Sequence, residues 1–308
     1  MIVGFIFASY SIVANDAIQT LGTLISSNSK RPWWSLWIFT ATILVATIIY
    51  SWAVNGGDVA YGRLEKYPLP EPFTWIYVVA PITLLILTKF GIPVSTTFLI
   101  LTVFAPKNLE AMLTKSLMGY VVAILVAFVV VYFVSRSLEK KFAATRKQAP
   151  PLHWVILQLC STGFLWSQWL IQDLANIFVY LPRQISVNYL IFSLILMVTL
   201  HGLLFYFRGG EIQKVVLSKT NVSDIRSATI IDFMFAIILF VFKNLSNLPM
   251  STTWVFLGVL AGRELALTLI LKEKTMRETR AGISKDMAKA AFGLFISILI
   301  ATILPKLT

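Results

Sequence analysis

The sequence has 308 residues, of which 57% are hydrophobic and only 13% are charged, and its mean hydropathy is +0.80. A soluble protein of this length could not bury so much apolar surface, so the composition excludes that class and predicts a protein embedded in a bilayer. The net charge of +12 does not indicate nucleic-acid binding, because most basic residues lie between the apolar segments.

The apolar segments form two series of five. We predict them at residues 1–27, 33–54, 73–89, 94–105 and 111–134, and again at 153–181, 186–207, 227–246, 249–271 and 288–304. The fourth is too short to span, since a transmembrane helix needs ~20 residues. We therefore expect it to be a broken or re-entrant element packed inside the protein. A charged loop is predicted at 272–287.

A basic linker divides the two series. Residues 135–152 contain five basic residues and one acid, a net charge of +4, and then Pro150 and Pro151. The predicted organisation is a first repeat at 1–134, a cytoplasmic linker at 135–152 and a second repeat at 153–308.

One motif, Pro-x-Ser-Thr-Thr, occurs twice, at residues 93–97 and 249–253. An acid precedes the motif serine by 79 residues in the first copy (Asp16) and by 78 in the second (Asp173). A repeated motif with matched spacing in an apolar chain predicts two copies of one unit, as in many transporters.

Charge counts predict the topology. Five segments precede the cytoplasmic linker, so the N-terminus is placed outside and the second copy is inverted. Loop 55–72 has a net charge of −1 and is placed outside; loops 208–226 (+2) and 272–289 (+3) are placed inside. The sequence thus predicts an all-α integral membrane protein, multi-pass in a cell or inner membrane, with two inverted repeats.

The first helix of each repeat carries the predicted cation residues. Ser11, Asn15 and Gln19 align with Gln168, Gln172 and Asn176 when Asp16 is placed on Asp173. The i, i+4, i+8 spacing puts three hydrogen-bonding groups on one helix face beside a carboxylate. Carboxylate and carbonyl oxygens are ligands for hard cations, and an intramembrane acid is a functional candidate. The alternative is that these polar groups only hold helices together.

The two motifs are predicted to bind an anion. Pro93 and Pro249 can each start a helix, which places Ser95, Thr96 and Thr97, and likewise Ser251, Thr252 and Thr253, in a first turn. The amide N–H groups and positive dipole end of such a turn attract anions, and the hydroxyls add donors. Ordinary N-capping is the alternative.

The duplicated motifs resemble those of the PiT-type inorganic phosphate transporters. The resemblance rests on Asn15-Asp16 followed by Gln19, on residues 172–176, and on both Pro-x-Ser-Thr-Thr segments. It implies a symporter driven by Na⁺ or H⁺, with Asp16, Gln19, Asp173 and Asn176 near the cation and Asn15, Gln172 and the motif hydroxyls near phosphate. Gln19 and Gln172 stand where the family has asparagine, and Phe98 and Trp254 stand where it usually has histidine. Substrate and coupling ion therefore stay open, with sulfate or another oxyanion as the alternative.

The predicted function is secondary active transport, with no catalytic residue, no cofactor and no nucleic-acid partner; a homodimer is one option for its assembly. The competing class is a membrane enzyme acting on lipid phosphate with Asp16 or Asp173 as base, but an inverted duplication suits alternating access better. The remaining polar candidates are assigned as follows: Lys115 and Lys289 to snorkelling rather than substrate contact, Asp232 to a helix entrance, and His201 and Cys160 to the core.

Overall fold

The computed structural model describes residues 1–220, 222–245 and 250–304. Its helices are α1 (Ile2–Ile12), α2 (Ile18–Ser27), α3 (Trp33–Val54), α4 (Ile76–Lys89), α5 (Thr102–Phe104), α6 (Leu109–Val129), α7 (Arg136–Ala144), α8 (Leu152–Phe178), α9 (Val187–Tyr206), α10 (Gln213–Leu217), α11 (Ile225–Leu245), α12 (Thr252–Leu271) and α13 (Met276–Ile303). π-helical turns form η1 (Val13–Ala17), η2 (Thr97–Leu101) and η4 (Val130–Val134), and η3 (Pro106–Asn108) is a 3₁₀ turn.

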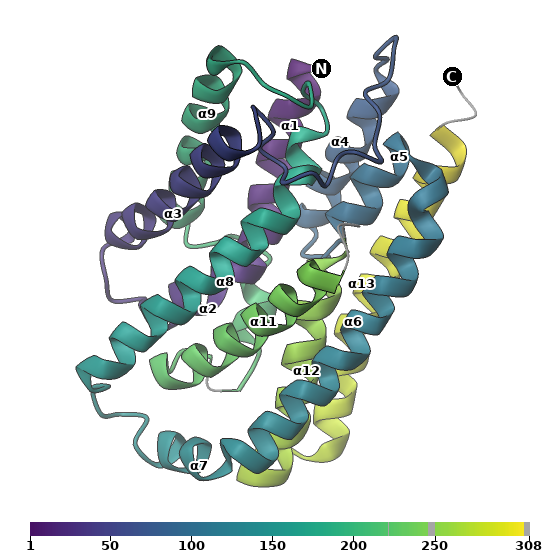
Figure 1. The fold of residues 1–308 in the computed structure, drawn as a ribbon. Helices are drawn as coiled ribbons and strands as arrows, with labels where there is room; N and C mark the ends of the chain where they lie inside the picture. Colours follow the sequence, from purple (N-terminus) through teal and green to yellow (C-terminus); the bar gives the residue numbers. More distant parts are fainter. Residues whose placement is uncertain (221, 246–249, 305–308) are drawn as a thin grey trace.

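The helices form an elongated bundle with its most buried members in the middle. α3 and α9 pack together on one side, and α6 and α13 run along the other (Figure 1). Between them lie α1–α2, α8, α11 and α12, with close pairs α8–α11 and α6–α12. The outer helices expose apolar faces, as expected where lipid is the solvent.

The predicted membrane-protein class is confirmed. Within the described residues, seven helices are long and apolar enough to cross a bilayer, and α4 is a shorter apolar helix. α8 is 27 residues long but carries buried polar residues along its second half. The predicted short segment 94–105 is indeed broken, into η2 and α5, and is enclosed by protein. The chain is therefore a multi-pass membrane protein.

Two glycines let α12 lie against α6 at backbone distance. A Cβ atom on Gly258 would come within 2.6 Å of the Tyr120 carbonyl oxygen, and one on Gly262 would overlap the Ile124 carbonyl. The pair forms a Gly-x-x-x-Gly spacing, which allows close helix contact in membranes. This contact fixes α12, and hence the motif at its start.

The two charged connections are more ordered than predicted. The loop expected at 272–287 is largely helix, because Thr275 and Glu278 form a capping box that starts α13 at Met276. The predicted linker contains α7, which buries Glu139 and Phe142. Glu139 accepts a hydrogen bond from Ser227 at 3.0 Å and pairs with Arg263 at 3.4 Å, so the linker packs against the second half.

Two single-residue predictions have opposite outcomes. His201 is a buried core residue as predicted, with its Nε2 2.7 Å from the Thr40 hydroxyl and its ring stacked on Trp166. Cys160 is exposed, so its core assignment is wrong. Cys160 lies on the outer face of α8, where lipid rather than protein covers apolar side chains.

Candidate functional site

The predicted acids lie in the centre of the bundle on two different backbone elements. Asp16 belongs to η1, a π-helical turn between α1 and α2, whereas Asp173 belongs to the continuous helix α8. Both side chains are 1% exposed. A π-turn inserts an extra residue into a helix and often marks a functional position. It also breaks the i, i+4, i+8 alignment that was predicted for the first helix.

Each acid is held by the motif threonine of its own half. The Thr96 hydroxyl donates to Asp16 Oδ2, and the Thr252 hydroxyl donates to Asp173 Oδ2 at 2.8 Å. These are equivalent positions in the two motifs, so the spacing seen in the sequence corresponds to a contact made twice. The matched contacts support the two-unit division, which remains a prediction together with its inverted orientation.

The two motif segments also contact each other. Thr97 Oγ1 donates to the carbonyl of Met250 at 3.3 Å, and Thr253 Oγ1 donates to the carbonyl of Val94 at 3.1 Å. The second threonine of each motif thus bonds the backbone carbonyl three residues before the second threonine of the other motif. Because the exchange is reciprocal, both motifs converge on one place.

Asn176 connects the two acids. Its Nδ2 donates to Asp173 Oδ1 at 2.7 Å and to the Thr96 hydroxyl at 3.1 Å, and Thr96 in turn donates to Asp16. Two buried carboxylates joined by so short a chain repel each other unless a cation or a proton offsets their charge. This is the electrostatic setting that a cation site requires.

Two of the predicted amide residues have unbonded oxygens, and two others donate to Asp16. Asn176 Oδ1 and Gln172 Oε1 are buried without a hydrogen-bond partner among the described residues, although Gln172 Nε2 bonds the Leu239 carbonyl at 3.0 Å. Asn15 Nδ2 donates to Asp16 Oδ1 at 2.6 Å and to the Val94 carbonyl at 2.7 Å. Gln19 Nε2 lies 3.5 Å from Asp16 Oδ1. Buried orphan carbonyl oxygens beside a carboxylate fit a hard cation such as Na⁺.

The motif serines act as helix caps. Ser95 Oγ accepts from the Phe98 amide and Ser251 Oγ from the Trp254 amide, both at 3.3 Å. Each helical segment therefore begins after the serine, whereas the prediction had it start at the proline. Pro93 precedes the first turn, and Pro249 lies outside the described residues. An N-cap oxygen that accepts from an amide still has its own O–H to donate.

Glycines from the opposite half pack against each motif, and one lysine bonds the backbone just before the first motif. Lys289 Nζ donates to the Gly91 carbonyl at 3.0 Å, and its snorkelling stays a prediction. Lys115 is 8% exposed and is enclosed by protein. Added Cβ atoms on Gly119 and Gly293 would contact Met250 and Val94, which are equivalent positions. α6 thus braces the second motif, and α13 braces the first.

One buried basic side chain near the site was not predicted from the sequence. Arg63 belongs to loop 55–72, which was assigned to the outside, yet it is 3% exposed and within electrostatic range of Asp173. Burial lowers the pKa of the Arg63 guanidinium to about 10, and the charge of Asp173 opposes that shift. A loop residue has no periodicity that would signal burial, so only the fold could place this charge.

Asp232 was assigned to a helix entrance, and that prediction is wrong. Its side chain is 0% exposed and lies two turns inside α11, where Thr23 and Thr162 donate to it. Hydroxyl groups from two neighbouring helices therefore satisfy both oxygens of this buried side chain.

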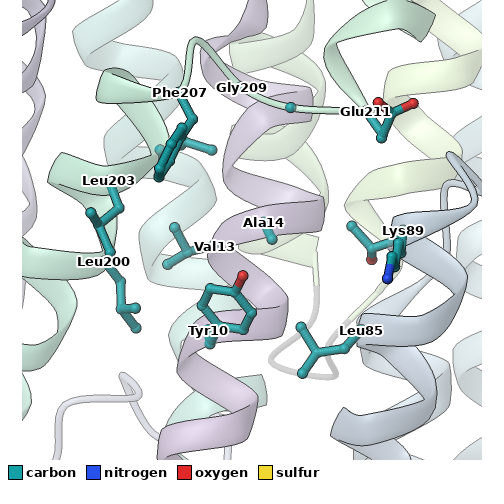
Figure 2. Close-up of a pocket in the computed structure, with 13 residues that line it drawn as sticks. Tyr10, Val13, Ala14, Leu85, Lys89, Leu200, Leu203, Phe207, Gly209 and Glu211 are labelled. Atoms are coloured by element: carbon teal, nitrogen blue, oxygen red, sulfur yellow. The ribbon is translucent and has the colours of Figure 1, made fainter.

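A cavity of about 550 Å³ lies beside the site but does not include it. Figure 2 shows Tyr10, Val13 and Ala14 on one wall and Leu85 and Lys89 on another, with Leu200, Leu203, Phe207 and Glu211 completing the lining. None of the predicted site residues lines this cavity. The serines and threonines of both motifs are at most 4% exposed, so the structure has the site closed.

Comparison with known proteins supports the fold class. The chain resembles a solved structure described as "The sodium-dependent phosphate transporter", with a TM-score of 0.62 over 100% of this chain and 98% of that chain, at 16% sequence identity. No protein-family model matches the sequence, and no curated protein matches it. The chain is thus a helical membrane protein with the fold of a transporter, as the motifs predicted.

Proposed function

We propose that this protein is a cation-coupled symporter of a small inorganic oxyanion. Phosphate is the favoured substrate, and Na⁺ is the favoured coupling ion. The observation that carries the proposal is the reciprocal meeting of the two motifs at two buried acids. The solved structure with the same fold is named a sodium-dependent phosphate transporter, which supports the same substrate and ion here.

The cation would bind between Asp16 and Asp173. Gln19 and Asn176 bond these carboxylates, and the unbonded oxygens of Asn176 and Gln172 complete an oxygen-rich set. Within the described residues there is no cluster of three or more His, Cys, Asp or Glu side chains. Amide and hydroxyl oxygens around few carboxylates suit a monovalent hard cation that must bind reversibly.

The anion would bind at the two motif starts. Ser95 and Ser251 keep hydroxyl protons to donate, Thr97 and Thr253 bring the two starts together, and Asn15 lies beside the first of them. Positive helix ends and uncharged donors hold an oxyanion without fixing it permanently. The cation next to it offsets the charge, which is a physical reason for coupled movement.

Sulfate is the alternative substrate, because a tetrahedral oxyanion of either kind matches helix ends and hydroxyls. H⁺ is the alternative ion, because a proton also neutralises a buried carboxylate. Hydrolysis of a lipid phosphate is not favoured, because both acids accept hydrogen bonds from threonine in the same way and neither is set apart as a base.

The test is uptake of radiolabelled phosphate and sulfate into proteoliposomes with an imposed Na⁺ or pH gradient. We expect accumulation of phosphate that needs inward Na⁺. Uptake of neither anion under either gradient would overturn the proposal, and preference for sulfate or for a pH gradient would select the alternative.

A further inference from the structure

Asp232 is a buried acid that the proposed transport site does not use. The Thr23 hydroxyl of α2 is 2.6 Å from its Oδ1, and the Thr162 hydroxyl of α8 bonds its Oδ2. Within the described part of the chain Asp232 takes part in no ion pair. An ionised carboxylate without a cation at this depth is costly, so the group is most stable as a neutral acid.

The fold itself does not require an acid here. Asp232 precedes the second motif serine by 19 residues, and the residue at the same distance before Ser95 is Ile76, which is 3% exposed. A buried apolar side chain therefore fills the equivalent position of the first half. The acid at position 232 is therefore an addition specific to the second half, and it bonds Thr23 of the first half and Thr162 of the second.

Among the described residues, the bonds to the acid come from the two threonine hydroxyls. The elements packed against α11 are α2, α6, α7, α8 and α12, and α2 has no ionisable side chain. The buried ionisable groups on the others are Lys115, Glu139, Asp173, Arg263 and Glu264. Arg263 and Glu139 pair with each other, and Glu264 pairs with Lys274. On α11 itself, Arg226 pairs with Asp224.

A polar route leads to Asp232 from a cavity at the basic end of the bundle. This cavity, of about 610 Å³, is lined by Ser26, Ser27, Asn28, Val155 and Arg226 among others. Its floor is a hydrogen-bonded layer in which Gln158 bonds Ser27 at 2.5 Å and Asn28 at 2.9 Å.

The next polar layer is one helical turn deeper. Thr23 lies four residues before Ser27 on α2, and Thr162 lies four residues after Gln158 on α8. Ser27 Oγ bonds the Thr23 carbonyl at 2.7 Å. Side chains that donate and accept therefore lie between the cavity and the acid on both helices.

We propose that Asp232 is a proton-binding site, reached from the cavity at Ser27 and Asn28, that controls how α11 packs against α2 and α8. In the protonated state the acid O–H donates to one threonine hydroxyl, and the other hydroxyl donates to the carbonyl oxygen. On release the O–H bond breaks, the proton passes to water in the cavity, and the carboxylate left behind draws water between the helices.

The consequence for transport rests on the proposed function. α2 continues directly from the turn that holds Asp16, and α8 carries Asp173 eleven residues beyond Thr162. A change in the packing of α2 and α8 therefore reaches both cation residues. Proton release at Asp232 favours opening of the site toward the cavity side.

The direct test does not involve transport. Infrared difference spectra of the purified protein, recorded between low and high pH, report the carbonyl stretch of protonated carboxylic acids. We expect a band that disappears as pH rises, is missing in Asp232→Asn, persists in Asp16→Asn, and shifts in frequency in Thr162→Val, which loses one hydrogen bond. An unchanged band in both Asp232→Asn and Thr162→Val would overturn the proposal.

The functional test uses uptake into proteoliposomes with the same pH on both sides. Wild-type uptake driven by Na⁺ should change with pH by at most about tenfold per pH unit, the limit for one proton. Asp232→Asn should retain uptake but lose this dependence, and identical pH profiles would overturn the link to transport. If the wild type takes up neither anion, the proposed function fails while the infrared result still decides the proton site.

Discussion

The first and second halves of the chain place equivalent side chains on different backbones. In the first half the acid sits in a π-turn, and its motif starts an element that ends at Phe104. In the second half the acid sits in a continuous helix, and its motif starts the 20-residue helix α12. The bonds from Thr96 and Thr252 to the acids are nevertheless the same. The two halves therefore share the contact between threonine and acid, although the backbone elements that carry it differ.

The difference in length has a local cause. Pro106 occupies the position eleven residues after Ser95, and Gly262 occupies the position eleven residues after Ser251. Proline lacks the amide proton and clashes with the preceding turn, so it kinks or ends a helix. Gly262 keeps the helix intact and lets it lie on the α6 backbone. One residue thus decides whether a half-helix or a full helix follows the motif.

The largest expected effect tests whether the two acids are equivalent. Asp16→Asn and Asp173→Asn keep shape and remove charge, so each should lower Na⁺ affinity about tenfold to a hundredfold, the range for a charged partner, and collapse gradient-driven uptake. Glu273→Gln, at an exposed pair with Arg146, is the matched control and should change little. Uptake with unchanged Na⁺ dependence in both variants would show that the two acids have only a structural role.

Next in size is the effect of the two motif serines. Ser95→Ala and Ser251→Ala each remove a hydroxyl donor, which should weaken anion affinity by roughly tenfold to a hundredfold if the partner is charged. Each also removes a cap, at a cost of about 1 kcal/mol in the free energy of unfolding.

The double serine variant separates these two effects. If both hydroxyls donate to one anion, their losses in affinity are non-additive, whereas two separate caps lose stability independently. Anion affinity and melting temperature should be measured for both single variants and for the double. Additive losses of stability with unaltered anion affinity would show that the motifs do not bind the anion.

A smaller effect is expected from the glycine that distinguishes α12. Gly262→Ala places a methyl group against the Ile124 carbonyl, and such overpacking costs about 1–3 kcal/mol. Gly282→Ala is the control, because a Cβ there meets nothing within 4 Å and alanine favours a helix by ~1 kcal/mol. Thermal unfolding in detergent should show opposite shifts. A stable Gly262→Ala protein would show that α6 and α12 can separate freely.

The smallest effect on activity, and the most direct test of inversion, comes from labelling. Cysteines at the exposed positions Glu65 and Lys140, in a Cys160→Ala background because Cys160 is itself exposed, should leave uptake intact. An impermeant thiol reagent should reach them from opposite sides of the membrane. Reaction of both from the same side contradicts the inverted repeat.

The sequence alone determined the membrane class and most of the long helices, and it predicted polar residues that the fold brings together at the centre. Long apolar segments predict membrane-spanning helices, because the backbone must satisfy its own hydrogen bonds in lipid. The repeated spacing of Asp16 to Ser95 and of Asp173 to Ser251 predicted two copies of one unit, and the fold makes equivalent contacts from the neighbouring threonines. The capping box of Thr275 and Glu278 is also visible in the sequence, within the stretch predicted as a loop.

Only the tertiary structure decided which groups from elsewhere surround that site. Arg63 comes from a connecting loop, Lys289 from the opposite half, and Asp232 joins α2 and α8 through two threonines. None of these positions has a periodicity that signals its partner. The reason is physical: spacing along a helix fixes which side chains share a face, whereas the partner across an interface depends on how distant helices pack.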